Sequence, residues 1–152
     1  MRYVTASKAA GPFGHYSQAV VHGGLVYVSG QLPAELGGNE KRLGPIEEQT
    51  ERAMRNLRET LLAAGSDLCH VLKTTVYISD ISLWDRVNSV YAAFFAEHRP
   101  ARAIVPTNPL HHGFQIEIEA IASLNEAGHR LPGAQLPEAA VCPEGGANAG
   151  SI

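Results

Sequence analysis

A strict alternation of apolar and polar residues over the segment GFQIEIEAIAS, residues 113–123, constrains the fold more than any other feature of the sequence. The apolar positions are Phe114, Ile116, Ile118 and Ala120, and the polar positions between them are Gln115, Glu117 and Glu119. Successive side chains of a β-strand point to opposite faces of the sheet, so this strand has one apolar and one polar face. The pattern predicts a sheet that is packed against other elements on one face only.

The segment QAVVHGGLVYVSGQL, residues 18–32, predicts a β-hairpin. Its two runs of β-branched and aromatic residues are separated by Gly23 and Gly24, a pair that readily adopts the positive φ of a tight turn. Residues 33–45 are mostly polar, with proline at both ends, and predict a connecting loop. Residues 70–78 are rich in β-branched side chains and too short for a helix, so we predict a strand there.

Two segments have helical periodicity. Apolar residues recur at helical spacing over residues 46–64, with a proline just before the segment and a glycine just after it. A second apolar stripe covers residues 83–95, and Ser82 and Asp85 at its start resemble a capping box. With a further strand around Arg102, the order of elements predicts an α+β domain whose two helices cover one face of a sheet.

We assign residues 1–125 to one folded domain and residues 126–152 to a C-terminal tail rich in proline, glycine and alanine. The tail has no sustained periodicity, and we expect it to be ordered only where it packs on the domain or on a neighbouring subunit. The sequence has no apolar signal core and no run of membrane-spanning length. Cys69 and Cys142 lack the spacing of a disulfide framework, so we expect free thiols and a cytoplasmic protein.

Charge and motif content argue against several classes of function. The chain has 12 Lys and Arg against 15 Asp and Glu, a net charge of -3, which gives no cationic surplus for a nucleic acid partner. Its seven histidines show no metal-ligand spacing, so we predict no metal site. G-x-S-x-G, P-loop and G-x-G-x-x-G motifs are also missing, so esterases, nucleotide hydrolases and dinucleotide enzymes lack their local signals.

Arg102 and Glu117 are the first candidates for chemistry. Arg102 lies in RPARAIV, which otherwise predicts a short buried strand, and a permanently charged guanidinium there must reach solvent or meet an anion. It is either a structural arginine at a sheet edge or a fork that binds a small carboxylate. Glu117 lies either on a solvated sheet face or at a subunit interface, where a desolvated carboxylate could hold a proton or orient a water molecule.

Tyr16 and Asn88 are weaker candidates. Tyr16 follows a Gly-Pro-Phe-Gly loop and precedes a strand, so its phenol could close over a pocket, or it could be a partly buried tyrosine with a solvated hydroxyl. Asn88 lies inside the second predicted helix, where a local hydrogen bond explains it equally well.

Several motifs occur together in an order and spacing that resemble the Rid family, the YjgF-like reactive-intermediate deaminases. They are GHYSQAVVHGGLVYVSGQLP, IEEQTERAMRNLRETLLAAGS, VLKTTVYISDISLWDRVNSVYAAFF, RPARAIV and IEIEAIA. The resemblance covers Gly11 to about Ala122. It implies a chorismate-mutase-like α+β fold, a homotrimer with active sites between subunits, and no cofactor or metal. It also implies hydrolysis of enamines and imines, of the 2-aminoacrylate and 2-iminopropanoate type, to 2-keto acids and ammonia.

The resemblance also assigns residues to that chemistry. Arg102 matches the arginine that binds the substrate carboxylate, and Glu117 matches the glutamate that helps to place the attacking water. The residues that match positions around the substrate are Tyr16, Ser29, Gly30, Asn88 and Ile104, the last standing where many members have a cysteine.

Two places depart from the common pattern of the family. The segment PTNPLHHGF begins with Pro106, which has no N–H to donate, so we expect an edge or a bulge in that strand. The loop before Tyr16 carries extra residues. Two alternatives to a general imine deaminase therefore stay open: a deaminase of a larger unsaturated amino acid, and a non-catalytic protein that binds a small ligand or acts on RNA.

Overall fold

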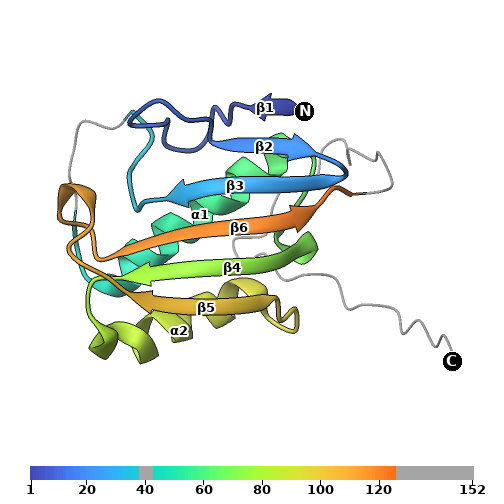
Figure 1. The fold of residues 1–152 in the computed structure, drawn as a ribbon. Helices are drawn as coiled ribbons and strands as arrows, with labels where there is room; N and C mark the ends of the chain where they lie inside the picture. The colour runs from blue at the N-terminus through green and yellow to red at the C-terminus, as the bar shows by residue number, and fades with distance from the viewer. Residues whose placement is uncertain (38–42, 126–152) are drawn as a thin grey trace, which may run out of the picture.

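The computed structural model describes residues 1–37 and 43–125 of the chain, and the predicted tail lies outside them. Within these residues, six strands form one mixed sheet in the order β1-β2-β3-β6-β4-β5, and both helices pack on the same face of it (Figure 1). The helices are α1 (Ile46–Ala64) and α2 (Trp84–Phe95). The strands are β1 (Arg2–Val4), β2 (Ala19–His22), β3 (Leu25–Gln31), β4 (Val71–Ile78), β5 (Ala101–Pro106) and β6 (Ile116–Ser123). The predicted α+β architecture is confirmed.

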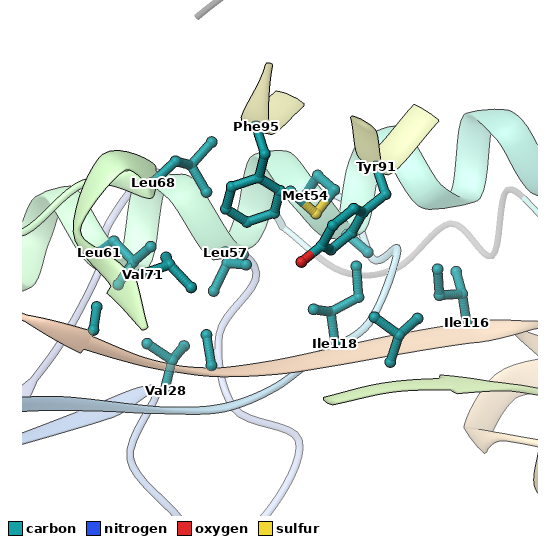
Figure 2. Packing of buried hydrophobic residues seen from close by; sticks show 14 of the residues in the cluster. Val28, Met54, Leu57, Leu61, Leu68, Val71, Tyr91, Phe95, Ile116 and Ile118 are labelled. Carbon is teal, nitrogen blue, oxygen red and sulfur yellow. The ribbon is translucent and has the colours of Figure 1, made fainter. Parts of the chain in front are cut away.

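The alternating segment forms β6, which lies inside the sheet and pairs antiparallel with β3 and with β4. Its apolar positions are buried and its polar positions are half-buried on the other face, as the alternation predicts. Figure 2 shows Ile116 and Ile118 pointing from the strand toward the layer of helices that carries Leu57, Tyr91 and Phe95. Burying an isoleucine side chain contributes about 1.5–3 kcal/mol, so this face of the strand holds the helices on the sheet.

Glycines in left-handed conformations end α1 and turn the hairpin, as the sequence predicts. Gly65 follows α1 with φ 89°, and the Ser66 N–H donates to the carbonyl oxygen of Leu61 at 2.9 Å, which satisfies an otherwise free carbonyl at the helix end. Gly23 and Gly24 join β2 to β3 with φ 58° and 77°. This geometry matches the right-handed twist of the two strands.

The start of α2 differs from the prediction. Leu83 is the N-cap residue and its side chain makes no capping hydrogen bond. Asp80 instead accepts a hydrogen bond from the Ser82 N–H at 2.8 Å and caps a short 3₁₀ turn, Ile81–Leu83, that leads directly into the helix. The predicted capping box of Ser82 and Asp85 is therefore wrong, because the capping carboxylate lies before the turn.

β5 is an edge strand that pairs in parallel with β4. The expectation of a buried strand around Arg102 is wrong, because among the described residues β5 pairs with one strand only and no residue in it is fully buried. The expectation of an edge at Pro106 is confirmed. Pro106 pairs with Ile78 at the end of the ladder, and the N–H of Thr107 donates to the Ile78 carbonyl oxygen at 2.9 Å in its place.

Three further observations complete the comparison with the sequence. β1 was not predicted, and it extends the sheet by pairing antiparallel with β2. Cys69 is disulfide-bonded, so the expectation of a free thiol is wrong there, while Cys142 lies outside the described residues. None of the described helices combines the length and the apolar character needed to cross a membrane.

Candidate active site

A groove of about 560 Å³ lies where the end of β3 and the start of β6 meet two loops. We term it the Glu117 groove, and its lining residues are Phe13, Gly14, Tyr16, Ser29, Gly30, Leu32, His111, His112 and Glu117. Four of the residues predicted for the site, Tyr16, Ser29, Gly30 and Glu117, are therefore brought together. They come from segments separated by about a hundred residues of sequence, which the pairing of β3 with β6 brings side by side.

Glu117 projects from β6 on the face opposite Ile116 and Ile118, into the Glu117 groove. Burial raises the pKa of its carboxyl group, the nearby His111 lowers it, and Glu119 on the same face raises it. A carboxyl group whose pKa is raised takes up a proton more readily than one in water. The arrangement can therefore accept a proton from a bound water molecule or orient that water.

Gly30 permits the close approach of the Glu117 carboxylate to β3. A Cβ atom at position 30 would lie 2.7 Å from the Cδ atom of Glu117, closer than real side chains approach each other. The pairing of β3 with β6 shifts between Val28 and Gln31, so Gly30 lies within an irregular part of the ladder. A larger residue here would displace the Glu117 carboxylate, so glycine serves for space and not for an unusual φ angle.

Tyr16 and Ser29 hold the loop that forms the mouth of the groove. The Phe13 N–H donates to the Tyr16 hydroxyl at 3.1 Å, and the Tyr16 ring is 45% exposed. The Ser29 hydroxyl donates to the Ser17 carbonyl oxygen at 2.7 Å, and the Ser29 N–H donates to the carbonyl oxygen of Gln18 at 3.0 Å. Both hydroxyls are thus already engaged, and their first effect is to fix the loop on β3.

A second group of residues surrounds Arg102 on β5, and we term Trp84, Asn88, Tyr91 and Arg102 the Arg102 cluster. The Arg102 Nη1 atom donates to Asn88 Oδ1 at 2.9 Å. The guanidinium carbon lies 4.6 Å from the centroid of the Tyr91 ring and 5.8 Å from that of Trp84. The hydroxyl of Tyr91 is 2.8 Å from Thr74 Oγ1 on β4, which fixes the ring beneath the guanidinium.

Among the residues that the structure describes, no carboxylate forms an ion pair with Arg102. Its polar partner there is the neutral amide of Asn88. The aromatic rings of Tyr91 and Trp84 attract the cation without neutralising it. The Arg102 cluster therefore presents a fixed, uncompensated positive charge at the edge of the sheet.

Within one chain, the two groups lie on opposite faces of the sheet. Arg102 pairs with Thr74, whose buried side chain meets α2, so the Arg102 cluster is on the helix-covered face. Ile104 also packs against the core on that face. Glu117 is on the other face. The structure thus joins Asn88 to Arg102 but does not bring Arg102 and Glu117 together in a single copy.

Several residues around the two groups were not assigned from the sequence. The extra residues before Tyr16 and the segment PTNPLHHGF are visible in the sequence, but their pattern did not place Phe13, His111 or His112 in the groove. Tyr91 belongs to the apolar stripe of α2, and Trp84 at the start of that helix gave no separate signal. Within residues 1–37 and 43–125, no group of three or more His, Cys, Asp or Glu side chains could hold a metal ion.

The sequence model of the Endoribonuclease L-PSP family matches residues 6–124. The chain belongs to this family. The human protein named 2-iminobutanoate/2-iminopropanoate deaminase is 39% identical over 121 residues, which cover 80% of this chain and 88% of that protein. A Myxococcus xanthus relative, Protein DfrA, is 41% identical over 119 residues, which cover 77% of this chain and 88% of DfrA.

Solved structures of the L-PSP family share the fold. RidA from an Antarctic Psychrobacter has a TM-score of 0.77 and 36% identity, and the match covers 82% of this chain and 100% of RidA. TdcF from E. coli, solved with bound serine, has a TM-score of 0.77 and 31% identity, with the same coverage. The resemblance to the Rid proteins is therefore confirmed. The family match spans both the Glu117 groove and the Arg102 cluster.

Proposed function

We propose that the protein hydrolyses enamine and imine intermediates of the 2-aminoacrylate and 2-iminopropanoate type to 2-keto acids and ammonia. The similarity to the human 2-iminobutanoate/2-iminopropanoate deaminase supports this reaction. The observation that carries it is the uncompensated charge of Arg102, held in place by Asn88 and Tyr91. An endoribonuclease, which the family description names, is a poorer fit, because the net charge of -3 gives no cationic surplus for RNA.

Arg102 binds the substrate carboxylate in this proposal. A guanidinium has five N–H donors in a planar fork, and the hydrogen bond to Asn88 engages Nη1. The remaining donors match the two oxygens of a carboxylate, and charge-assisted hydrogen bonds of this kind are about twice as strong as neutral ones. Ile104 follows two residues later, and the free edge of β5 offers its backbone carbonyl to the substrate nitrogen.

Glu117 orients the water molecule and accepts its proton. The protonated imine carbon is electrophilic, so water adds to it and gives a tetrahedral carbinolamine, while Glu117 accepts the proton that the water loses. Glu117 returns this proton to the nitrogen. The C–N bond then breaks as the carbinol oxygen forms the C=O bond, the hydroxyl proton passes to the departing ammonia, and a 2-keto acid and ammonium are released. Positioning and charge supply the rate gain, so no covalent nucleophile is needed. Gly30, Ser29 and Tyr16 shape the groove in which this occurs.

We propose that the protein is a homotrimer with its active sites between subunits. The support is geometric: Arg102 and Glu117 lie on opposite faces of one sheet, so both can act on one substrate only when they come from two copies. Closed symmetric rings are the usual way to satisfy such a head-to-tail contact. We assign the activity to residues 1–125, and we expect the chain without residues 126–152 to keep both assembly and activity.

We place the protein in the cytoplasm. Imines of amino acids hydrolyse in water unaided, so an enzyme that accelerates this step must share the compartment of the pyridoxal-phosphate enzymes that release them. Fractionation of cells into cytoplasm and other compartments tests the assignment, and accumulation outside the cytoplasm would contradict it.

A coupled assay tests the reaction. A pyridoxal-phosphate dehydratase generates the imine from serine or threonine, and the release of ammonia and 2-keto acid is followed with and without the protein. We expect faster release with the wild type and no effect with Arg102→Ala, which should still assemble. Arg55→Ala is the matched control, because Arg55 is an exposed arginine paired with Glu51 on α1, remote from both groups. No acceleration at protein levels well above those of the dehydratase would refute the function.

A further inference from the structure

Aromatic rings form part of the lining of the Glu117 groove. Phe13 and His112 come from loops about a hundred residues apart, and their ring centroids lie 5.1 Å apart in a tilted arrangement. His111 continues the row, with its ring centroid 6.0 Å from that of His112. The three rings face a groove that also contains Glu117. We term Phe13 and His112 the aromatic wall.

The aromatic wall is held in position from behind. The Phe114 ring is buried and stands edge-on to His112 at a centroid distance of 6.3 Å. The Phe13 N–H is fixed by its hydrogen bond to the hydroxyl of Tyr16. His112 has φ 61° and ψ 14°, a left-handed conformation that is costly for a residue with a side chain. Such a conformation persists only when the surrounding contacts impose it, so these contacts hold the His112 ring in a defined position.

The groove combines a carboxylate with aromatic rings. The Glu117 carboxylate approaches Gly30, and water would attack an imine beside this carboxylate. Phe13 and His112 contribute two rings that contact each other, and His111 lies next to His112. The groove measures about 560 Å³, and pockets of roughly 300–1,000 Å³ accommodate ligands of drug size. A three-carbon imine engaged at Glu117 would leave the aromatic wall without a partner.

We propose that the aromatic wall receives the side chain of the substrate, and that the preferred substrates are 2-imino acids with an aromatic side chain. The inference rests on the proposed imine hydrolysis and names the substrate class for the same groove. Aromatic rings favour tilted and edge-to-face contacts with centroids about 4.5–7 Å apart, the geometry that the two rings already adopt with each other. A planar side chain entering between the loops extends this arrangement.

The test compares imines that differ only in the side chain. A flavin-dependent L-amino-acid oxidase generates the 2-imino acids of alanine and of phenylalanine, and trapping with semicarbazide reports how much imine survives. We expect the wild type to show a higher kcat/KM for the phenylalanine imine than for the alanine imine. Phe13→Ala and His112→Asn should each lower the ratio of the two values by about tenfold, the effect of losing one aromatic contact.

The variants are chosen to separate the rings from the backbone. Asparagine tolerates a left-handed conformation, so His112→Asn removes the ring without forcing the loop to rearrange. His112→Phe keeps a ring without a titratable group and should keep the preference. Tyr3→Ala is the matched control, because Tyr3 is an exposed aromatic residue on β1 and does not line the groove. It should leave the ratio unchanged.

A binding measurement distinguishes this inference from the proposed function. Titration calorimetry with the stable 2-keto acids phenylpyruvate and pyruvate should show tighter binding of phenylpyruvate to the wild type, and Phe13→Ala should remove the difference. If the protein accelerates hydrolysis of the alanine imine but neither assay shows an aromatic preference, the inference is wrong and the function stands. If no imine is hydrolysed faster, the proposed function is wrong. The calorimetry alone then decides whether the aromatic wall binds an aromatic side chain.

Discussion

The two groups proposed for the active site are built in different ways. The Arg102 cluster is made by packing between β5, β4 and α2, and the charged side chain itself is clamped by the Asn88 amide and the Tyr91 ring. The Glu117 groove is made by loops resting on β3 and β6, and its carboxylate lies close to a bare glycine backbone. The first group fixes a side chain, whereas the second leaves space. A residue that anchors the substrate needs a fixed side chain, and a reacting centre needs space to admit substrate and water.

The groups also face opposite ways. The helices that fix Arg102 cover one face of the sheet (Figure 1), and Glu117 projects from the other. In the proposed function, one copy binds the carboxylate with one face and positions water with the other, so it cannot do both to one small molecule. The proposed site therefore needs a second copy of the chain, and the first prediction tests this.

Mixing two inactive variants gives the largest expected effect. Arg102→Ala and Glu117→Ala should each be inactive alone. Unfolded and refolded together in equal amounts, they should recover about a quarter of the wild-type activity, because random assembly puts an intact arginine and an intact glutamate at that share of the interfaces. The coupled assay for ammonia and 2-keto acid measures the recovery.

The same experiment has an internal control. The control is the double variant, which carries both substitutions on one chain. Refolded alone, it should stay inactive, because it has no intact residue to exchange. Mixed with wild type, it leaves some interfaces intact. If the mixture of single variants stays inactive although size-exclusion chromatography shows mixed assemblies, the site does not combine Arg102 of one copy with Glu117 of another.

Gly30→Ala should strongly damage the Glu117 groove and leave the Arg102 cluster intact. The new methyl group would overlap the Glu117 side chain, which must move away. A misplacement of about 1 Å can cost a factor of about 10² in rate, so we expect a loss of that size in kcat. Gly11→Ala is the matched control, since a Cβ atom there meets nothing within 4 Å. Equal activity of the two variants would show that the position of the carboxylate is unimportant.

Much of the fold was predictable from local signals. The bounds of α1 follow from Pro45, Gly65 and the apolar stripe between them, and the hairpin follows from Gly23 and Gly24. β1 was not predictable, because three residues carry no period and its place is decided by pairing with β2. The cap of α2 was missed because Asp80 acts on a turn that precedes the helix.

The candidate residues could be named from the sequence, but their geometry could not. A period of two puts Arg102 and Ile104 on one face of β5, yet which face is buried depends on the parallel pairing with β4, and that pairing leaves no mark in the sequence. The role of Tyr91 was hidden for a different reason. Its position in an apolar stripe predicts a core residue, and it is one, while the face of the same ring also lies beneath the guanidinium.

Within the Arg102 cluster, the ring and the hydroxyl of Tyr91 should have separable effects. Tyr91→Leu removes the support beneath Arg102, and we expect KM to rise by about tenfold, corresponding to the 1–2 kcal/mol of a desolvated cation–π contact. Tyr91→Phe keeps the ring but breaks the hydrogen bond with Thr74, which should cost about 1 kcal/mol of unfolding free energy and leave KM nearly unchanged. Substrate titrations and urea denaturation measure the two quantities.

These two variants distinguish positioning from simple stability. If the Tyr91 ring matters only for core packing, Tyr91→Leu should lower the free energy of unfolding. Its KM should then be unchanged at temperatures where the variant is folded. Asn88→Ala tests the same point without changing the core. Asn88 is half-buried, and the substitution removes its hydrogen bond to Arg102 while the core residues stay in place. A rise in KM for both variants would place the effect on the arginine.

The smallest expected effect is a shift in pH dependence within the Glu117 groove. Burial raises the pKa of Glu117 above its usual 4.5, so the rise of kcat/KM that accompanies its ionisation should lie above pH 4.5. His111 lowers this pKa, so His111→Asn should move the rise to higher pH. A pH–rate profile with either imine measures the shift, and a profile that moves down or stays in place would contradict it.

The raised pKa of Glu117 also makes the free energy of unfolding depend on pH, with a slope opposite in sign to that of a carboxylate in an ion pair. Between 4.5 and its value in the folded protein, Glu117 binds more protons in the folded state than in the unfolded state. The free energy of unfolding should therefore fall as the pH rises through this window, and Glu117→Gln should remove that part of the fall. Urea denaturation of the two proteins across the window tests the sign: a free energy of unfolding that does not fall as the pH rises, or that falls equally in Glu117→Gln, would contradict it.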